Sequence, residues 1–406
     1  MTKRETADLV VVGGGAIGGW ASVFAKEAGA ERVLVLEREV AGKGASSRAA
    51  GMVRSQGGSP DTVRLGTWSI DFYGRQRAIY GSDSGFQGQG YVILASTRTD
   101  QKAAADRIVM QQEQGLDVRW VDADEARRLS PTLAERGYRG GSYVSTDGWL
   151  DPPTNVQAYL HAMRETGVEL RERTTFLGLR TKAGRGSSRI VTGVETSAGT
   201  ISTDRVILAA GPRMQAVAKL AGGRAWVGYA RHQVVVTQPH PDLAPERFGA
   251  MIFDMRAGIY WRPEEGGILW GMSNPHEAPG SARSIDWPYI RKMEKRLNAL
   301  VPITKDLGMR KVWAATIEYT PDHQPLLGPF VTDAGAEIRG ATIASACGHG
   351  MMWGPAVARI ASDLSLTGST DVVDRPGDFR MDRFDEQGNS PFVDPVALPF
   401  PVLVDE

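Results

Sequence analysis

The chain has 406 residues, with 47 Lys plus Arg and 47 Asp plus Glu, so its formal net charge is zero. This length allows a sizeable core and favours two domains, and the balanced charge argues against a nucleic-acid binder that works through a basic field. The single cysteine, Cys347, excludes an internal disulfide. Residues 1–10 contain no apolar signal region, and no run of eighteen apolar residues predicts a membrane span. These features favour a cytoplasmic α/β protein.

The first elements form one compact unit. Residues 8–12 (DLVVV) predict a buried parallel strand, 16–28 predict a helix, and 32–36 (RVLVL) predict a second strand that closes on Glu37. Gly29 is a plausible helix stop. The order strand, helix, strand in about thirty residues is that of a βαβ unit.

The glycines between the first strand and the helix carry the functional signal. Gly13, Gly15 and Gly18 give the pattern G-x-G-x-x-G, in which the first allows a tight turn, the second lets a pyrophosphate approach the backbone, and the third lets helix and strand pack. The helix N-terminus offers free N–H groups to phosphates, and Glu37 can accept hydrogen bonds from ribose hydroxyls. A purely structural glycine turn is the alternative, but the complete context favours a dinucleotide without a 2′-phosphate.

The loop that follows, residues 42–58 (GKGASSRAAGMVRSQGG), is rich in small residues. Small residues allow backbone to lie against a flat ring, so the loop is interpreted as a second phosphate and flavin cradle. A flexible surface loop is the alternative. Arg48 and Arg54 favour the cradle, because spaced arginines indicate contacts with anions.

The middle of the chain alternates between strand and helix patterns. Residues 91–96, 232–237 and 267–273 predict strands, whereas the charged, Ala-rich stretch 99–130 predicts helices. Within it, residues 121–131 (VDADEARRLSP) predict a helix start followed by a proline stop. Residues 151–166 predict a helix opened by Asp and two prolines, which suit the first turn.

A second strand–glycine–helix element lies near the C-terminus. Residues 341–361 (ATIASACGHGMMWGPAVARIA) predict a strand, a turn at 347–350 and a helix, and residues 205–210 predict another strand that ends on Gly211. The positive end of the later helix could stabilise negative charge on a reduced flavin.

In combination these motifs resemble the FAD-dependent amine and amino-acid oxidoreductases of the D-amino-acid oxidase superfamily. The resemblance is strongest to the group of sarcosine oxidase and dimethylglycine dehydrogenase, and it covers roughly residues 8–365. It is carried by VVGGGAIGG with Glu37, GASSRAAGMVR, VILAAG, RHQVVVTQ, WAATIEYTPDHQPLLG and CGHGMMWGPAVARI.

The resemblance implies a fold and a cofactor. The fold class is α/β, or α+β over the whole chain, with a Rossmann-like FAD-binding domain and an antiparallel-sheet substrate domain. The FAD-binding domain is expected at 1–85, 150–225 and 315–370, the substrate domain at 86–149 and 226–314, and a surface tail at 371–406. The residues expected to contact FAD are Gly13, Gly15, Ala16, Ile17, Gly18, Glu37, Arg38, Ser46, Ser47, Arg48, Gly51, Met52, Phe176, Ala210, Gly211, Gly348, His349, Gly350 and Met351.

The implied chemistry is hydride removal from the carbon next to an amine nitrogen, which leaves an imine for water to hydrolyse. Arg54 lies where relatives hold a substrate carboxylate, although it could instead brace the flavin loop. Tyr260 matches a site tyrosine or is an ordinary sheet residue, and His349 either positions backbone or is catalytic. Glu318 could favour a cationic amine or be a solvated loop carboxylate.

The sequence departs from monomeric sarcosine oxidases at several positions. Leu269 replaces an oxygen-activating lysine and Met352 replaces a lysine that binds carboxylate, which weakens the arguments for oxygen activation and for two-point carboxylate binding, so a larger, less acidic or more apolar substrate becomes possible. At the covalent attachment positions of the family stand Arg48 and residues 316–318, which predicts a non-covalent FAD. No metal is expected, and Cys347 is interpreted as a small core residue.

Three functions therefore stay open: an FAD-dependent amine or amino-acid oxidase or dehydrogenase, a flavin 2-hydroxy-acid dehydrogenase, and a non-catalytic FAD-binding subunit. For the first, the expected partners are a small-molecule amine or amino acid and O2 or another electron acceptor, without nucleic acid or membrane. The sequence leaves the oligomeric state open.

Overall fold

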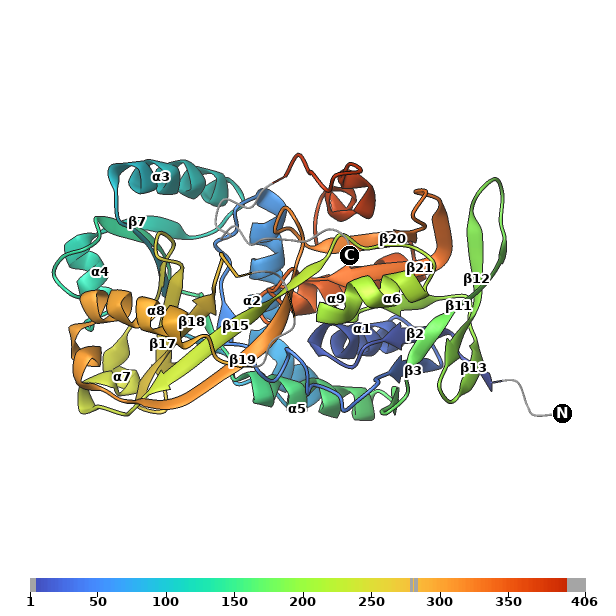
Figure 1. The fold of residues 1–406 in the computed structure, drawn as a ribbon, viewed down its shortest axis with the longest axis horizontal. Helices are drawn as coiled ribbons and strands as arrows, with labels where there is room; N and C mark the ends of the chain where they lie inside the picture. Colours follow the sequence, from blue (N-terminus) through green and yellow to red (C-terminus); the bar gives the residue numbers. More distant parts are fainter. Residues whose placement is uncertain (1–4, 278–279, 281–283, 393–406) are drawn as a thin grey trace.

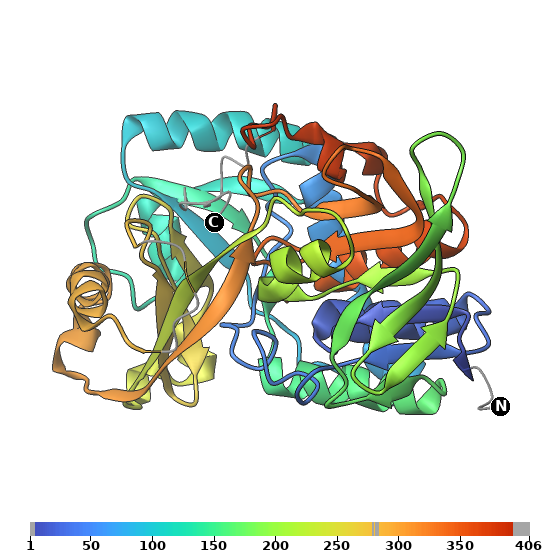
Figure 2. The same ribbon diagram turned by 45° about the vertical axis from the view of Figure 1, so that its right-hand side comes forward.

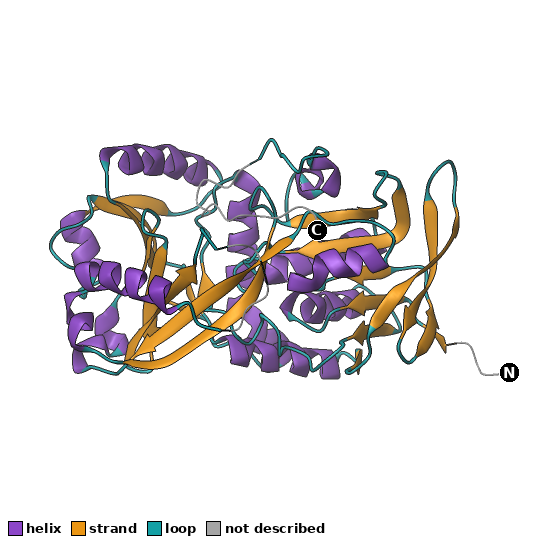
Figure 3. Ribbon diagram, viewed as in Figure 1, coloured by secondary structure: helices purple, strands orange, loops and turns teal. Residues whose placement is uncertain are grey.

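The described part of the chain forms two large sheets of different character, each with its own helices, and a third, small sheet (Figures 1 and 3). The computed structural model describes residues 5–277, 280 and 284–392. None of the helices in these ranges is long and apolar enough to cross a membrane.

The first sheet has ten strands and is parallel at its centre. The strands β21, β14, β2, β3 and β10 run parallel to one another, as short buried apolar strands commonly do. The predicted strand–helix–strand unit is confirmed in β2, the following helix and β3. In spatial order the strands are β1 (Glu5–Thr6), β13 (Gly199–Ser202), β12 (Arg189–Thr196), β21 (Glu337–Ser345), β14 (Val206–Leu208), β2 (Leu9–Val12), β3 (Val33–Leu36) and β10 (Glu169–Arg171), with β11 (Phe176–Ala183) beside β12 and β20 (Leu326–Val331) beside β21.

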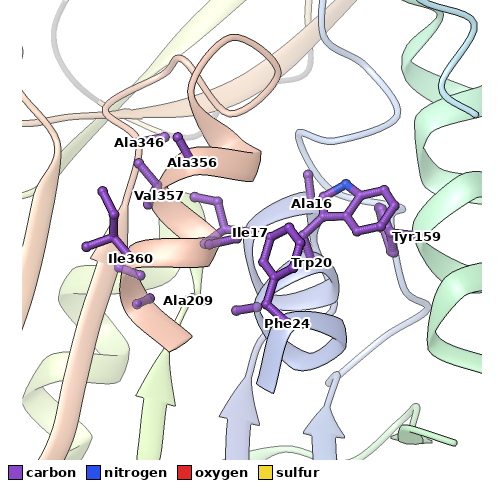
Figure 4. Close-up of a cluster of buried hydrophobic side chains, with 14 of the residues drawn as sticks. Ala16, Ile17, Trp20, Phe24, Tyr159, Ala209, Ala346, Ala356, Val357 and Ile360 are labelled. Carbon is purple, nitrogen blue, oxygen red and sulfur yellow. The ribbon is translucent and has the colours of Figure 1, made fainter. Parts of the chain in front are cut away.

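Helices cover this sheet and bury its core. Trp20 is fully buried, and its ring contacts those of Phe24, Phe72, Tyr80 and Tyr159. Figure 4 shows Trp20, Phe24 and Tyr159 of this group near the aliphatic residues that lie between α1 and α9. These contacts join α1 (Ala16–Glu27), α2 (Pro60–Tyr80), α5 (Pro152–Glu165) and α9 (Gly354–Leu366).

The second sheet has eight strands, and all neighbouring pairs are antiparallel except β16 with β6. In spatial order they are β19 (Met309–Tyr319), β15 (Gly228–Thr237), β18 (Gly267–Ser273), β17 (Ile259–Glu264), β16 (Met251–Asp254), β6 (Tyr91–Ala95), β8 (Gly140–Val144) and β7 (Val118–Asp122). Three short strands form a small sheet: β4 (Met52–Val53), β9 (Gly148–Trp149) and β5 (Gln87–Gly88). The other helical segments are α3 (Arg98–Glu113), α4 (Ala123–Leu129), α6 (Met214–Leu220), α7 (Pro245–Phe248), α8 (Trp287–Leu300), η1 (Gly211–Arg213), η2 (Pro241–Leu243), η3 (Pro302–Asp306), η4 (Pro376–Phe379) and η5 (Met381–Arg383).

The prediction that residues 99–130 are entirely helical is wrong at β7. This strand buries Val118 and Val121 and pairs with β8, so tertiary pairing prevails over the helical composition around it. The predicted helix start is correct, because the Asp122 carboxylate caps α4 by accepting from the N–H of Glu125 at 2.8 Å.

The strands β15 and β19 form a long two-stranded ribbon that extends from the second sheet toward α6 (Figures 1 and 2). Their pairing is continuous from Gly228 opposite Tyr319 to Val236 opposite Lys311. The ribbon therefore has one regular register where the two bodies meet.

The segment that begins at residue 371 is anchored through part of its length. Phe379, Met381 and Phe384 are buried, and Arg383 forms an ion pair of 2.7 Å with Asp322 in which both side chains are almost fully enclosed. The expected surface tail extends to residue 406, and its last part, 393–406, lies outside the described residues.

Candidate functional site

A cavity of about 1320 Å³ is lined by residues from both large sheets and from the loops between them. It brings together the predicted glycine motif, the loop 42–58, the C-terminal turn and the ribbon of β15 and β19. The predicted residues that line it are Gly13, Gly15, Ala16, Ile17, Glu37, Arg38, Ser46, Arg48, Gly51, Met52, Arg54, Ala210, Gly211, Tyr260, Glu318, Gly348, His349, Gly350 and Met351.

Three predicted cofactor residues lie outside this lining. A Cβ at Gly18 would overlap the carbonyl oxygen of Gly13, so this glycine lets α1 pack on the turn, the role the motif predicts. The N–H of Ser47 donates to the carbonyl of Gly42 at 3.1 Å. The side chain of Phe176 is buried in the apolar core of the first sheet. These three residues therefore lie outside the cavity lining.

The start of α1 is shaped for an anion. Gly15 is the N-cap and no side chain caps the helix there, while the N–H of Ala16 donates to Ser46 Oγ at 3.0 Å. Gly13 has φ of +115°, and a Cβ on it would overlap the carbonyl oxygen of Ala209. Open N–H groups at a helix start are a ready site for a phosphate.

Glu37 is held in place at the end of β3 by backbone donors. Its Oε2 accepts from the N–H of Gly14 at 3.0 Å, and its Oε1 accepts from the N–H of Glu39 at 2.8 Å. Each carboxylate oxygen keeps a further acceptor position. The carboxylate therefore has the position and chemistry to accept ribose hydroxyls.

Two side chains that the sequence interpretation missed hold the flavin loop. Trp313 Nε1 donates to the carbonyl of Arg48 at 3.0 Å, and Arg262 Nε donates to the carbonyl of Ala50 at 2.7 Å. Arg262 is 1% exposed, and its guanidinium lies 4.4 Å from the ring centre of Trp149. The loop is thereby fastened to the second sheet, which argues against a free surface loop.

Arg54 is buried beside a carboxylate that the sequence interpretation also missed. It is 4% exposed, and its guanidinium donates to the carbonyl of Gln56. Asp147 accepts from the N–H and Oγ of Ser55 at 2.7 and 2.5 Å, and from Gln56 Nε2 at 3.1 Å. Burial raises the pKa of Asp147 to about 6, although these hydrogen bonds and the charge of Arg54 oppose the rise. Arg54 therefore has both a bond within its own loop and a face on the cavity.

In the second sheet, a chain of hydrogen bonds joins side chains from four strands, β17, β15, β18 and β19. Tyr260 Oη lies 2.5 Å from His232 Nε2, His232 Nδ1 lies 2.9 Å from Ser273 Oγ, and Ser273 Oγ lies 3.3 Å from Tyr319 Oη. Burial lowers the pKa of His232 to about 4 and raises that of Tyr260. A neutral imidazole between two hydroxyls is a proton acceptor as well as a donor. The sequence interpretation included Tyr260 but missed His232.

The C-terminal turn adopts a backbone that fits close contact. Cys347 has φ of +50° and Gly348 has φ of +74°. His349 packs on Trp353 with ring centres 4.2 Å apart, and its Nδ1 has no hydrogen-bond partner in the described part of the chain. Burial and the charge of Arg54 lower the pKa of His349 to about 3, so its ring is neutral.

Glu318, Leu269 and Met352 differ in whether they line the cavity. Glu318 is 5% exposed and lines the cavity beside Gly211, and burial raises its pKa. Leu269 is buried in the core of the second sheet, whereas Met352 lines the cavity. No group of three His, Cys, Asp or Glu suited to a metal occurs within residues 5–277, 280 and 284–392.

The glycine turn at the start of α1, the carboxylate of Glu37 at the end of β3 and the cavity between the two large sheets form an arrangement typical of a dinucleotide-dependent oxidoreductase. The chain belongs to the FAD dependent oxidoreductase family, whose sequence model matches residues 8–364. The cofactor is therefore FAD, and the resemblance inferred from the motifs is confirmed.

Curated relatives extend this finding. The chain is 26% identical over 373 residues to 4-methylaminobutanoate oxidase (formaldehyde-forming) of Paenarthrobacter nicotinovorans, covering 89% of this chain and 44% of the relative. It is 24% identical over 382 residues to the mitochondrial dimethylglycine dehydrogenase of Homo sapiens, covering 90% and 43%. The chain thus spans less than half the length of these relatives.

Solved structures show the same fold. The L-proline dehydrogenase from P. horikoshii superposes with a TM-score of 0.86 at 24% identity, covering 96% of this chain and 100% of that one. Glycine oxidase from Geobacillus kaustophilus gives 0.78 at 24% identity, covering 93% and 99%.

Proposed function

We propose that the chain oxidises the C–N bond of a small amine or amino acid that carries a carboxylate. The observation that carries this proposal is the pair of Tyr260 and neutral His232 in the same cavity as buried Arg54 and the glycine cradle. FAD, when bound, supplies the hydride acceptor. The names of two relatives, 4-methylaminobutanoate oxidase and dimethylglycine dehydrogenase, support the same class of reaction.

Arg54 binds the substrate carboxylate in this proposal. A guanidinium presents a planar set of donors that matches a carboxylate, and burial strengthens such a pair. Asp147 lies behind the loop and partly offsets the charge of Arg54, since the arginine lowers the pKa of this carboxyl. The cation is therefore balanced in the free site and available to an anion in the occupied one.

Tyr260 and His232 hold the substrate amine in its neutral form. We assign the Nδ1–H tautomer to His232, donating to Ser273, so that Nε2 accepts the hydroxyl proton of Tyr260. Because burial lowers the pKa of His232 to about 4, the imidazole disfavours a further proton, and the pair selects the neutral amine, whose N–H donates to Tyr260 Oη. The neutral amine has the lone pair that departure of a hydride requires, and water hydrolyses the resulting imine.

The remaining features of the proposal are a non-covalent FAD, O2 or another electron acceptor, and a cytoplasmic location. The cavity is lined by Arg48, Thr316, Ile317 and Glu318 where attachment would be expected, and none of these side chains is a Cys or His. The single cysteine, which is buried, suits a reducing compartment.

An anaerobic titration tests the function. Flavin absorbance is recorded with secondary amines and amino acids, and separately with 2-hydroxy acids of matching carbon chain. We expect bleaching by a carboxylate-bearing amine. Bleaching by hydroxy acids alone would instead establish a C–O oxidising enzyme, and a protein that keeps FAD but is bleached by no member of a broad panel would favour a non-catalytic subunit.

A further inference from the structure

The register of the ribbon separates two neighbouring residues of β19. His232 pairs with Ala315 and Gly228 pairs with Tyr319, so His232 and Tyr319 share one face. Glu318 pairs with Tyr229 and points to the other face. The hydrogen bonds agree with this, because Tyr319 reaches Ser273, the partner of His232, whereas Glu318 does not join that chain.

The surroundings of Glu318 are two of the glycines expected beside the cofactor. Its Oε2 lies 3.7 Å from the position that a Cβ on Gly211 would take. A Cβ on Gly348 would lie 3.1 Å from the carbonyl oxygen of Glu318, and the N–H of Gly348 interacts with its carboxyl group. Gly211 ends the segment after β14, and Gly348 belongs to the turn before α9. Glu318 is therefore placed against the backbone of both later strand–glycine–helix elements.

The charge environment of Glu318 is unusual for a carboxyl group. No Lys, Arg or His in the described ranges forms an ion pair with it, and burial raises its pKa. Burial disfavours an ionised carboxylate that has no cation beside it, whereas the backbone N–H groups of Glu318 and Gly348 favour the ionised form. In its protonated form the carboxyl group has an O–H donor. A neutral acid is poorly suited to hold a cationic amine, but it can donate to an oxygen of a bound cofactor.

We propose that Glu318 is a cofactor-contacting residue whose carboxyl group hydrogen-bonds to FAD, on the opposite face of β19 from the substrate amine. The inference rests on the cofactor of the family and on the strand register. It adds one statement to the proposed function, namely that Glu318 contacts the cofactor and not the substrate.

The test separates the two roles by replacing the acid with a neutral isostere. Glu318→Gln keeps a donor of similar shape, whereas Glu318→Ala removes it. FAD affinity is measured by quenching of flavin fluorescence on titration into apoprotein. We expect Glu318→Ala to raise the FAD Kd about 10-fold and Glu318→Gln to change it less than about 3-fold.

Tyr319→Phe is the matched control on the opposite face of the same strand. It removes the hydroxyl that joins Ser273 and should leave the FAD Kd unchanged. An unchanged FAD Kd in Glu318→Ala, with circular dichroism like that of the wild type, would overturn the proposal. A Glu318→Gln variant whose FAD Kd rises as much as that of Glu318→Ala would also overturn it, since the amide keeps an N–H donor of similar shape. The FAD titrations remain decisive even if no amine proves to be a substrate.

Discussion

Arg54→Met is the substitution that best distinguishes a substrate clamp from a brace of the flavin loop. The arginine donates to the carbonyl of Gln56 within its own loop, and it also lines the cavity. Methionine keeps much of the length of the side chain but removes the charge and the donors. If Arg54 binds the substrate carboxylate, the variant must accommodate an anion without a partner.

The size of the effect follows from the burial of Arg54 and from its neighbour. Breaking a buried ion pair costs about 3–5 kcal/mol. We expect a cost at the lower end of this range, about 3 kcal/mol or about 150-fold in kcat/KM, because protonation of Asp147 can partly compensate for the lost positive charge. Its pKa is already raised to about 6, and without the charge of Arg54 it takes up a proton more readily. Protonation of Asp147 in the variant would thereby leave the bound substrate carboxylate without a second negative charge nearby.

The assay compares one carboxylate-bearing amine with its uncharged analogue and records the flavin-to-protein ratio. The uncharged analogue should lose less than about 3-fold, since it has no anion to bind. Asp147→Asn is the control for a changed electrostatic background, and it should leave carboxylate binding intact or stronger. Equal losses for both substrates at full flavin occupancy would refute the role in carboxylate binding. Loss of FAD together with both activities would show that Arg54 braces the loop.

Four further outcomes are expected. Glu37→Gln should weaken FAD binding by about 1.5–3 kcal/mol, as loss of a charged acceptor does, and an unchanged Kd in apoprotein titrations would refute the assignment of Glu37. Gly51→Ala should destabilise the protein and lower its FAD content, because Gly51 has φ of +77° and a Cβ would overlap the carbonyl of Leu150; Gly44→Ala, in the same loop with nothing within 4 Å, is the matched control and should be close to neutral. Acid or heat should release FAD into the supernatant, and flavin that stays with the precipitate would reveal a covalent bond. The unfolding free energy should fall as the pH drops from about 6.5 toward 4, because His232 has a folded pKa of about 4 against 6.5 and the unfolded state binds the proton first; a His232→Asn variant should show a shallower dependence in urea titrations.

The cofactor cradle could be predicted from sequence because its parts are local. Gly13, Gly15 and Glu37 lie within one strand–helix–strand unit, and the spacing of the glycines reflects backbone geometry that no other residue satisfies as well. The same locality explains why the caps of α4 and α5 were predicted correctly, since Asp122 and Asp151 each accept from an N–H three residues later.

The substrate wall could be predicted only in part because it depends on strand register. His232 lies on β15 and Tyr260 lies on β17, and their side chains meet across β18, which lies between these two strands. No pattern within either segment fixes that alignment. Arg262 reaches the carbonyl of Ala50 from 212 positions along the chain. The strand β7 was missed for the same reason, because its pairing with β8 outweighs the composition of the residues that flank it.

Cys347 provides a natural reporter of local opening in the protein. The thiol is fully enclosed, accepts from the N–H and hydroxyl of Thr320 at 3.3 and 3.2 Å, and has a pKa raised by burial to about 12. A thiol reagent can therefore reach it only when the turn at 347–350 opens, and the chain has no second cysteine to add background labelling. The labelling rate of the unmodified protein then measures that opening directly. A comparison with and without FAD would show how much the cofactor stabilises the segment that carries His349.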